Sequence, residues 1–288
     1  MMPPLKEPFE KFESVKELPT IPETLSSILS LVTDPHSSVA DLARVVERDQ
    51  SLTAKVLRMV NSAFYGFYRQ VTTVRDAAVI LGFNEIRILA LTVSMFDVFQ
   101  ASPSGWERGR FWEHSLVVGI ATESLATRAR LDSKEAFVAG LLHDLGKVAF
   151  DHVLGEKWLD LVIQAGKEGI PLNEIEKARL GMDHGELGAW LGEKWHLPEG
   201  IITAMQFHHH PDELRHAARL CTAVRVANSI VKGKGIGLSG NPCVEAVEDW
   251  MLPRLNLDKK IFEEVESHIT SDLKSVQAAA HHAGTGRR

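Results

Sequence analysis

The stretch ETLSSILSLV (23–32) repeats apolar side chains at helical intervals, at Leu25, Ile28, Leu29 and Val32. This spacing is typical of an amphipathic α-helix, because turns of 3.6 residues bring such positions onto one face. The same pattern recurs at Leu42, Val45 and Val46, at Leu52, Val56, Met59 and Val60, and at Ile86, Leu89, Val93 and Phe96. Strand-like alternation is nearly absent, since its one candidate (71–74) is short and polar. The sequence therefore predicts an all-α fold.

Loop-forming stretches suggest how the chain is divided. SPSG (102–105) follows about five helical segments and precedes a long helix expected over about 106–130, so it predicts a boundary between two lobes. KGKGIGLSGNP (232–242) is rich in glycine and polar residues and predicts a mobile loop before a final helical pair. We therefore expect an N-terminal tail (1–13), a first helical lobe (14–105), a second lobe (106–231), a loop with a helical extension (232–275) and a flexible tail (276–288).

Composition argues against several classes of protein. The chain has 32 Lys and Arg against 38 Asp and Glu, a net charge of −6, so nucleic acid is not an expected partner. Its two cysteines, Cys221 and Cys243, do not suggest a disulfide framework or a cysteine zinc site. The N-terminus has no apolar run of the signal-peptide kind, and no 18-residue apolar run follows. We expect a cytoplasmic protein without a membrane partner.

Two short helices, expected over 38–48 and 51–63, could also form a DNA-binding helix-turn-helix. The second helix carries Lys55 and Arg58 but directs most of its remaining side chains to one apolar face. We favour packing inside the first lobe and expect this apolar face to be buried.

The stretch GLLHDLGK (140–147) delivers His143 and Asp144 from an apolar sequence. Adjacent helical side chains diverge by about 100°, so this pair suits a carboxylate that bridges two ions better than a pair that grips one ion. Other histidines recur on apolar helices, at His114, His184, His208, His209 and His210. Each histidine alone would more often be structural, but together they predict a site for iron, manganese or zinc.

These motifs resemble the HD superfamily of metal-dependent phosphohydrolases. LPTIPETLSSIL (18–29), VVERDQSLTAKVLRMVNSAFYG (45–66), TVRDAAVILGFNEIRILAL (73–91) and HGELGAWLGEKWHLPEGIITAMQFHHHP (184–211) are similar to the HDOD family, an HD-related output domain of bacterial signalling proteins. The resemblance spans roughly residues 14 to 231. It implies an N-terminal helical lobe packed on an HD-like lobe, and a regulatory role.

The resemblance also implies a ligand set. By the pattern of the related HD-GYP enzymes, His114 and His143 belong to a first metal position and Asp144 bridges to a second. His184, His208 and His209 complete the second position, although the pair could instead be His209 and His210. The implied cofactor is one or two divalent ions.

The chain departs from this pattern at two places. Asn228 stands where the superfamily has a ligand aspartate, and an amide oxygen is a neutral, weaker ligand. HHHPDELRHAAR (208–219) replaces the DGxGYP signature of HD-GYP enzymes. Two-metal hydrolysis needs both ions, so we expect a non-catalytic signalling module with a degenerate metal cleft. The alternative is a metal-dependent phosphohydrolase.

Two expectations concern ligands. Lys147 matches a lysine that lies near substrate phosphate in active HD enzymes, or it is a solvated lysine at a helix end. The chain shows no recognisable receiver, sensor or cyclase domain. We therefore expect its signal to come from a signalling protein partner or a small phosphorylated ligand.

Overall fold

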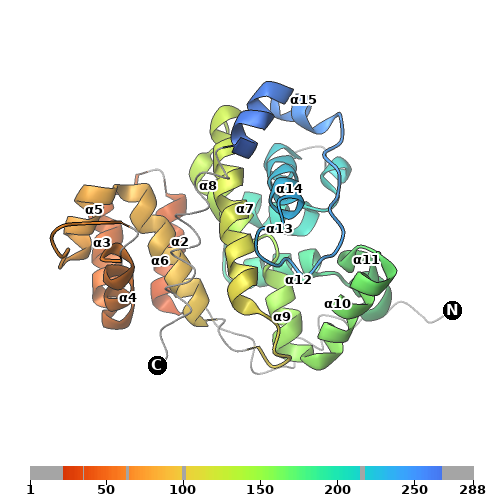
Figure 1. Cartoon of the computed structure of the whole chain (residues 1–288), viewed down its shortest axis with the longest axis horizontal. Coiled ribbons are helices and arrows are strands. Elements are labelled where there is room, and N and C mark those ends of the chain that lie inside the picture. The colour runs from red at the N-terminus through yellow and green to blue at the C-terminus, as the bar shows by residue number, and fades with distance from the viewer. Residues whose placement is uncertain (1–21, 35, 63–64, 99–101, 215–217, 268–288) are drawn as a thin grey trace. The chain divides into compact units, whose positions relative to one another are not determined.

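The computed structural model describes residues 22–34, 36–62, 65–98, 102–214 and 218–267, and these ranges are mostly helical (Figure 1). They contain no β-strand, which confirms the all-α prediction. No helix in these ranges is long and apolar enough to cross a bilayer. The helices are α2 (Glu23–Thr33), α3 (Val39–Arg48), α4 (Gln50–Val60), α5 (Val74–Leu81), α6 (Phe83–Val98), α7 (Arg108–Arg128), α8 (Ser133–Leu142), α9 (Leu145–Leu154), α10 (Glu156–Glu168), α11 (Leu172–Leu180), α12 (His184–Lys194), α13 (Glu199–Phe207), the 3-10 turn η1 (Pro211–Glu213), α14 (Ala218–Gly233) and α15 (Met251–Leu255).

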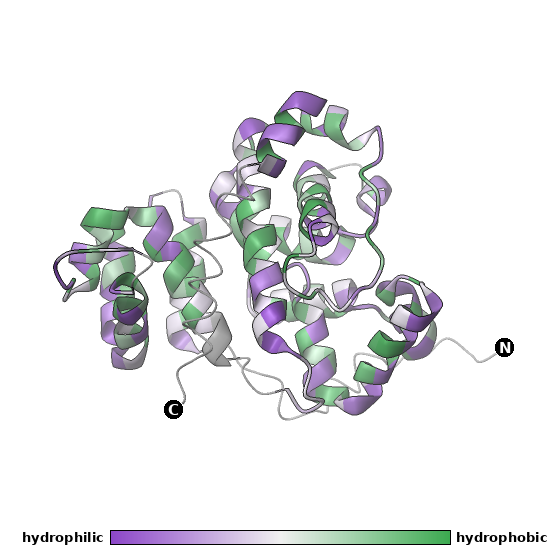
Figure 2. Cartoon of the chain, viewed as in Figure 1, coloured by the Kyte–Doolittle hydropathy of each residue, from purple (hydrophilic) through white to green (hydrophobic). Residues whose placement is uncertain are grey.

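Helices α2 to α6 form one compact unit. In it α6 packs against α2, α4 and α5, and α3 packs against α2, α4 and α5. Figure 2 shows apolar and polar residues alternating around these helices, as amphipathic helices require. The apolar face predicted for α4 is buried, at Leu52, Val56, Met59 and Val60. This confirms that the face belongs to the core, so α4 does not present it as a free recognition face.

A capping box starts α3. The Ser38 hydroxyl accepts from the backbone N–H of Asp41 at 3.2 Å, and the Asp41 carboxylate accepts from the backbone N–H of Ser38 at 3.0 Å. Both groups satisfy backbone donors that the first helical turn leaves free.

Ser38→Ala should destabilise α3 by about 1 kcal/mol, because the N-cap hydroxyl is lost. Amide exchange in α3 should therefore be roughly fivefold faster when measured by mass spectrometry. Ser51→Ala, at an exposed position inside α4, is the matched control and should leave exchange there unchanged or slower, since alanine favours helix. Equal exchange in Ser38→Ala and the wild type would contradict the role of this cap.

The second unit contains α7 to α15. Its central helix α7 packs against α8 and α14, and α12 packs against α9 and α13. The long helix expected over 106–130 therefore exists, one turn or less shorter at each end. The tails expected at 1–13 and 276–288 lie outside the described residues, and the division into lobes predicted from the sequence stays a prediction.

The segment after α14 makes contacts with distant helices that its composition did not indicate. We name residues 236–245 the strap; it appears as part of the blue tube between α14 and α15 (Figure 1). Ile236, Ser239 and Asn241 are buried, and the backbone N–H of Leu238 donates to the carbonyl of Arg110 at 2.9 Å. Hydrogen bonds with distant helices therefore hold this part of 232–242 in the structure, while its expected mobility stays a prediction. Of the final helical pair, α15 is present, and residues 259–267 are also helical.

Candidate metal centre

Close packing of α9 against α12 brings Asp144 and His184 together. His143 is the C-cap residue that follows α8, and Asp144 is the N-cap residue that precedes α9. A Cβ on Gly146 would lie 1.9 Å from the carbonyl oxygen of His184, so only glycine lets α9 approach the start of α12 this closely. This approach places His184, the first residue of α12, beside Asp144.

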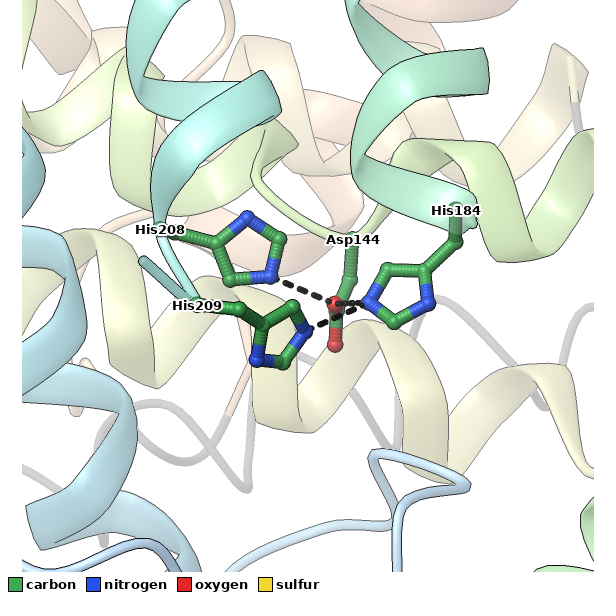
Figure 3. Close-up of side chains that lie close together, drawn as sticks. All are labelled: Asp144, His184, His208 and His209. Carbon is green, nitrogen blue, oxygen red and sulfur yellow. Dashed lines mark hydrogen bonds and ion pairs between the residues drawn. The ribbon is translucent and has the colours of Figure 1, made fainter. Parts of the chain in front are cut away.

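The Asp144 carboxylate lies at the centre of the site (Figure 3). Its Oδ1 faces Nε2 of His184 at 3.2 Å and Nε2 of His208 at 3.5 Å. Its Oδ2 faces Nε2 of His143 at 3.2 Å and Nζ of Lys147 at 2.6 Å. His209 joins through its Nε2, which lies 2.9 Å from Nε2 of His184. The two oxygens of one carboxylate therefore face two different groups of side chains.

These side chains form two buried donor groups that share Asp144. One comprises Asp144, His184, His208 and His209, and the other comprises His114, His143 and Asp144. Within each group the donor atoms lie within 4.8 Å of one another. The structure thus brings together five of the predicted histidines with Asp144, while their role as metal ligands stays a prediction. His210 is exposed and belongs to neither group.

In His143 and His208, the ring nitrogen that points away from Asp144 is hydrogen-bonded to a backbone carbonyl. Nδ1 of His143 lies 2.7 Å from the carbonyl oxygen of Gly140, and Nδ1 of His208 lies 2.8 Å from that of Met205. A carbonyl oxygen only accepts, so Nδ1 donates in both rings and Nε2 keeps its lone pair when the ring is neutral. Such outer partners fix the tautomer and orientation of metal-binding histidines.

Two glutamates hold two more rings in the same way. Glu176 Oε2 lies 2.5 Å from Nδ1 of His184, and Glu245 Oε1 lies 3.1 Å from Nδ1 of His209. Neither glutamate was among the site residues predicted from the sequence. The sequence could have indicated that Glu176 is buried, because this acidic residue shares a helix face with the apolar residues Leu172 and Ile175. Glu245 had no such signal.

Several buried polar atoms make no hydrogen bond, which tests whether an ion fits. Among the described residues, no hydrogen bond reaches Nε2 of His114, His143 or His208, nor Oδ1 of Asp144 or Asn228. Unsatisfied buried polar atoms cost about 1–3 kcal/mol each. A divalent cation would satisfy ring nitrogens and carboxylate oxygens together, and this mixed donor set suits iron, manganese or zinc. The residues present therefore fit such an ion.

Asn228 lies in α14, a helix that packs against α7, which carries His114. Its side chain is buried. It carries the neutral amide in place of the carboxylate that the family resemblance implies.

Protonation in the site is uneven. Burial lowers the pKa of His114 to about 3 and that of His208 to about 4, so both rings are neutral. Burial also opposes a proton on His184, but the Glu176 and Asp144 carboxylates outweigh it and raise that pKa to about 9. Burial would raise the pKa of Asp144, yet His143 and Lys147 hold it well below its usual range. Asp144 is therefore an ionised ligand candidate.

Lys147 is buried, with 1% of its surface exposed. Its Nζ donates to Asp144 Oδ2 at 2.6 Å and to the carbonyl oxygen of Ser239 at 3.0 Å. The interpretation of Lys147 as a solvated lysine at a helix end is therefore wrong. Its contact with a phosphate stays a prediction.

Comparison with known proteins places this arrangement in a family. Residues 18–211 match the model of the HDOD domain. An HDOD domain protein of unknown function from Geobacter sulfurreducens has a similar structure, with 26% identity, 98% of each chain covered and a TM-score of 0.81. A putative signal transduction protein from Marinobacter aquaeolei VT8 shares the fold, with 23% identity, 97% of this chain and 66% of that chain covered, and a TM-score of 0.80.

Sequence relatives are longer than this chain. An uncharacterized protein from Treponema pallidum is 26% identical over 223 residues, which cover 76% of this chain and 43% of that protein. Ribonuclease Y from Lactobacillus gasseri is 32% identical over 117 residues, which cover 41% of this chain and 16% of that protein. The chain thus spans less than half the length of these curated relatives. The match over 18–211 and the shared all-helical structure show that the chain belongs to the HDOD family.

Proposed function

We propose that this chain is a signal-transduction output module that holds one divalent ion and does not hydrolyse phosphoesters. The burial of the site carries this proposal. His114, His143, Asp144, His184 and His208 each have 0% of their surface exposed. A phosphoester substrate must contact such a centre directly, and this conformation gives it no access.

The donor groups support a single ion. The group of His184, His208 and His209 supplies three imidazoles beside one Asp144 oxygen. The other Asp144 oxygen is already paired with the Lys147 ammonium. An ion held by His184, His208, His209 and Asp144 would stabilise negative charge on an oxygen bound to it, as divalent ions do. A second cation beside His114 and His143 would meet the Lys147 ammonium, and by the family resemblance Asn228 would offer it a neutral amide in place of a carboxylate, so the second ion is disfavoured.

The test is metal content and phosphoester turnover of the purified protein, reconstituted with ferrous iron or manganese. We expect one ion per chain and no hydrolysis of bis-p-nitrophenyl phosphate or p-nitrophenyl phosphate above that of Asp144→Asn. Brisk turnover by the wild type, lost in Asp144→Asn, would overturn the proposal. It would favour a phosphohydrolase, the alternative that the retained histidines support.

A non-catalytic module needs a partner to transmit its state, and we propose a signalling protein. Exposed apolar side chains of the first unit support this proposal, because they offer protein contact area: Tyr68, Val79 and Ile80. A small phosphorylated ligand stays the second candidate. The net charge of −6 continues to disfavour nucleic acid.

A further inference from the structure

We infer that the strap (236–245) contributes to ion binding at the metal centre, with Glu245 as a positioning residue for His209. Ion binding and docking of the strap are therefore coupled. The strap lies beyond residue 211, where the match to the HDOD model ends. The inference rests on the proposed function, because it requires that the site holds an ion.

The strap touches the centre at three points. Glu245 Oε1 lies 3.1 Å from Nδ1 of His209. The carbonyl oxygen of Ile236 lies 3.4 Å from Nδ1 of His114, and that of Ser239 accepts from Nζ of Lys147 at 3.0 Å. Both donor groups therefore have a ring whose orientation depends on the strap. Lys147, the cation on Asp144, depends on it as well.

Glu245 is itself fixed by two cations of α14. Its Oε1 lies 3.1 Å from NH1 of Arg225, and its Oε2 accepts from Nζ of Lys232 at 2.8 Å. Only 12% of its side chain is exposed. A carboxylate held at both oxygens is a rigid acceptor, so it sets the direction in which the His209 ring presents Nε2. When the strap leaves, the ring loses this support.

Gly237 shows how closely the strap is seated. A Cβ there would lie 2.5 Å from the carbonyl oxygen of Arg110 and 2.5 Å from the backbone nitrogen of His114. Its φ is +66°, which also favours glycine. Gly235 has the similar φ of +65°, but nothing lies within 4 Å of its Cβ position. Alanine at Gly235 would therefore add backbone strain alone, whereas alanine at Gly237 would add the same strain and also collide with Arg110 and His114.

Coupling follows from these contacts. An ion that fixes His209 favours the docked strap, and the docked strap raises affinity for the ion by the same factor, since linkage is reciprocal. The strap also carries Val244, an exposed apolar side chain, so its docking changes a surface that a partner can contact. A partner that contacts this surface would thereby respond to whether the buried site holds an ion.

The experiment measures ion affinity by chelator competition, with manganese as the probe, and amide exchange of residues 234–247 with and without manganese. In the wild type, manganese should slow exchange in the strap. Glu245→Gln and Gly237→Ala should each weaken manganese binding about 10–100-fold, as loss of outer partners does. They should also abolish the slowing. Glu248→Gln, at an exposed glutamate that bonds the Trp250 indole, and Gly235→Ala are the matched controls and should behave as wild type.

The outcomes separate the two claims. Absence of any bound ion in the wild type would overturn the proposed function, and this inference with it. Wild-type binding of one ion with equal affinity in Glu245→Gln and Gly237→Ala would overturn the inference alone. So would strap exchange that ignores manganese in the wild type, a result that needs no variant to fold. Melting of the metal-free variants, followed by circular dichroism, checks that lost affinity is not lost folding.

Discussion

Asp144→Asn should lower affinity for the divalent ion by at least about 100-fold, because even outer partners of metal ligands are worth 10–100-fold. Asp144 is the residue that both donor groups share. Its replacement by an amide keeps the shape but removes negative charge from every donor group at once. Chelator competition with manganese measures the loss, and tryptophan fluorescence checks that the variant folds although Lys147 loses its ionic partner.

Asn228 supplies the contrast for this prediction. Asn228→Ala should keep the single ion, because the amide is a poor ligand. Asn228→Asp should raise the content toward two ions, since it restores the carboxylate that the family pattern has at this position. Wild-type affinity in Asp144→Asn, or loss of the ion in Asn228→Ala, would show that the ion is held elsewhere.

Asp151→Ala should lower the free energy of unfolding of the second unit by about 3–5 kcal/mol, because it leaves the buried guanidinium of Arg108 without its counterion. Arg108 Nε donates to Asp151 Oδ2 at 3.1 Å, and the side chains are 4% and 0% exposed. The Ser104 hydroxyl also donates to Asp151. The pair joins the start of α7 to α9, which begins beside Asp144.

Urea unfolding followed by tryptophan fluorescence measures this loss. All six tryptophans lie between residues 106 and 250, so the signal reports the second unit. Asp160→Ala, at an exposed aspartate of α10, is the control and should change stability by no more than about 0.5 kcal/mol. If Asp151→Ala lowers the free energy of unfolding as little as this control does, the Arg108 guanidinium does not depend on Asp151 as its counterion.

Much of the fold was predictable because helical periodicity records burial directly. Leu25, Ile28, Leu29 and Val32 all face the core, as their spacing indicates. Val45 is only half-buried, since it lies at the margin of its helix face. The side chain of Phe96 lies outside the described residues.

The site was predictable where ligand chemistry leaves a local signature. An adjacent His143 and Asp144 in an apolar stretch, with histidines on later helices, indicated convergence that the structure shows. The strap was not predictable, because its order comes from distant groups such as Arg110 and Lys147. Its glycines suggested flexibility, whereas Gly237 permits a close approach. Glu245 pairs with a histidine 36 residues away, and no local pattern encodes such a pair.

We propose that this HDOD chain holds a single ion beside Asp144. Anomalous diffraction from crystals of the iron-loaded protein, recorded at the iron edge, tests it most directly. We predict one peak per chain, among the side chains of Asp144, His184, His208 and His209. A second peak of similar height beside His114 and His143, or no peak near Asp144, would show that the chain does not hold a single ion at this position.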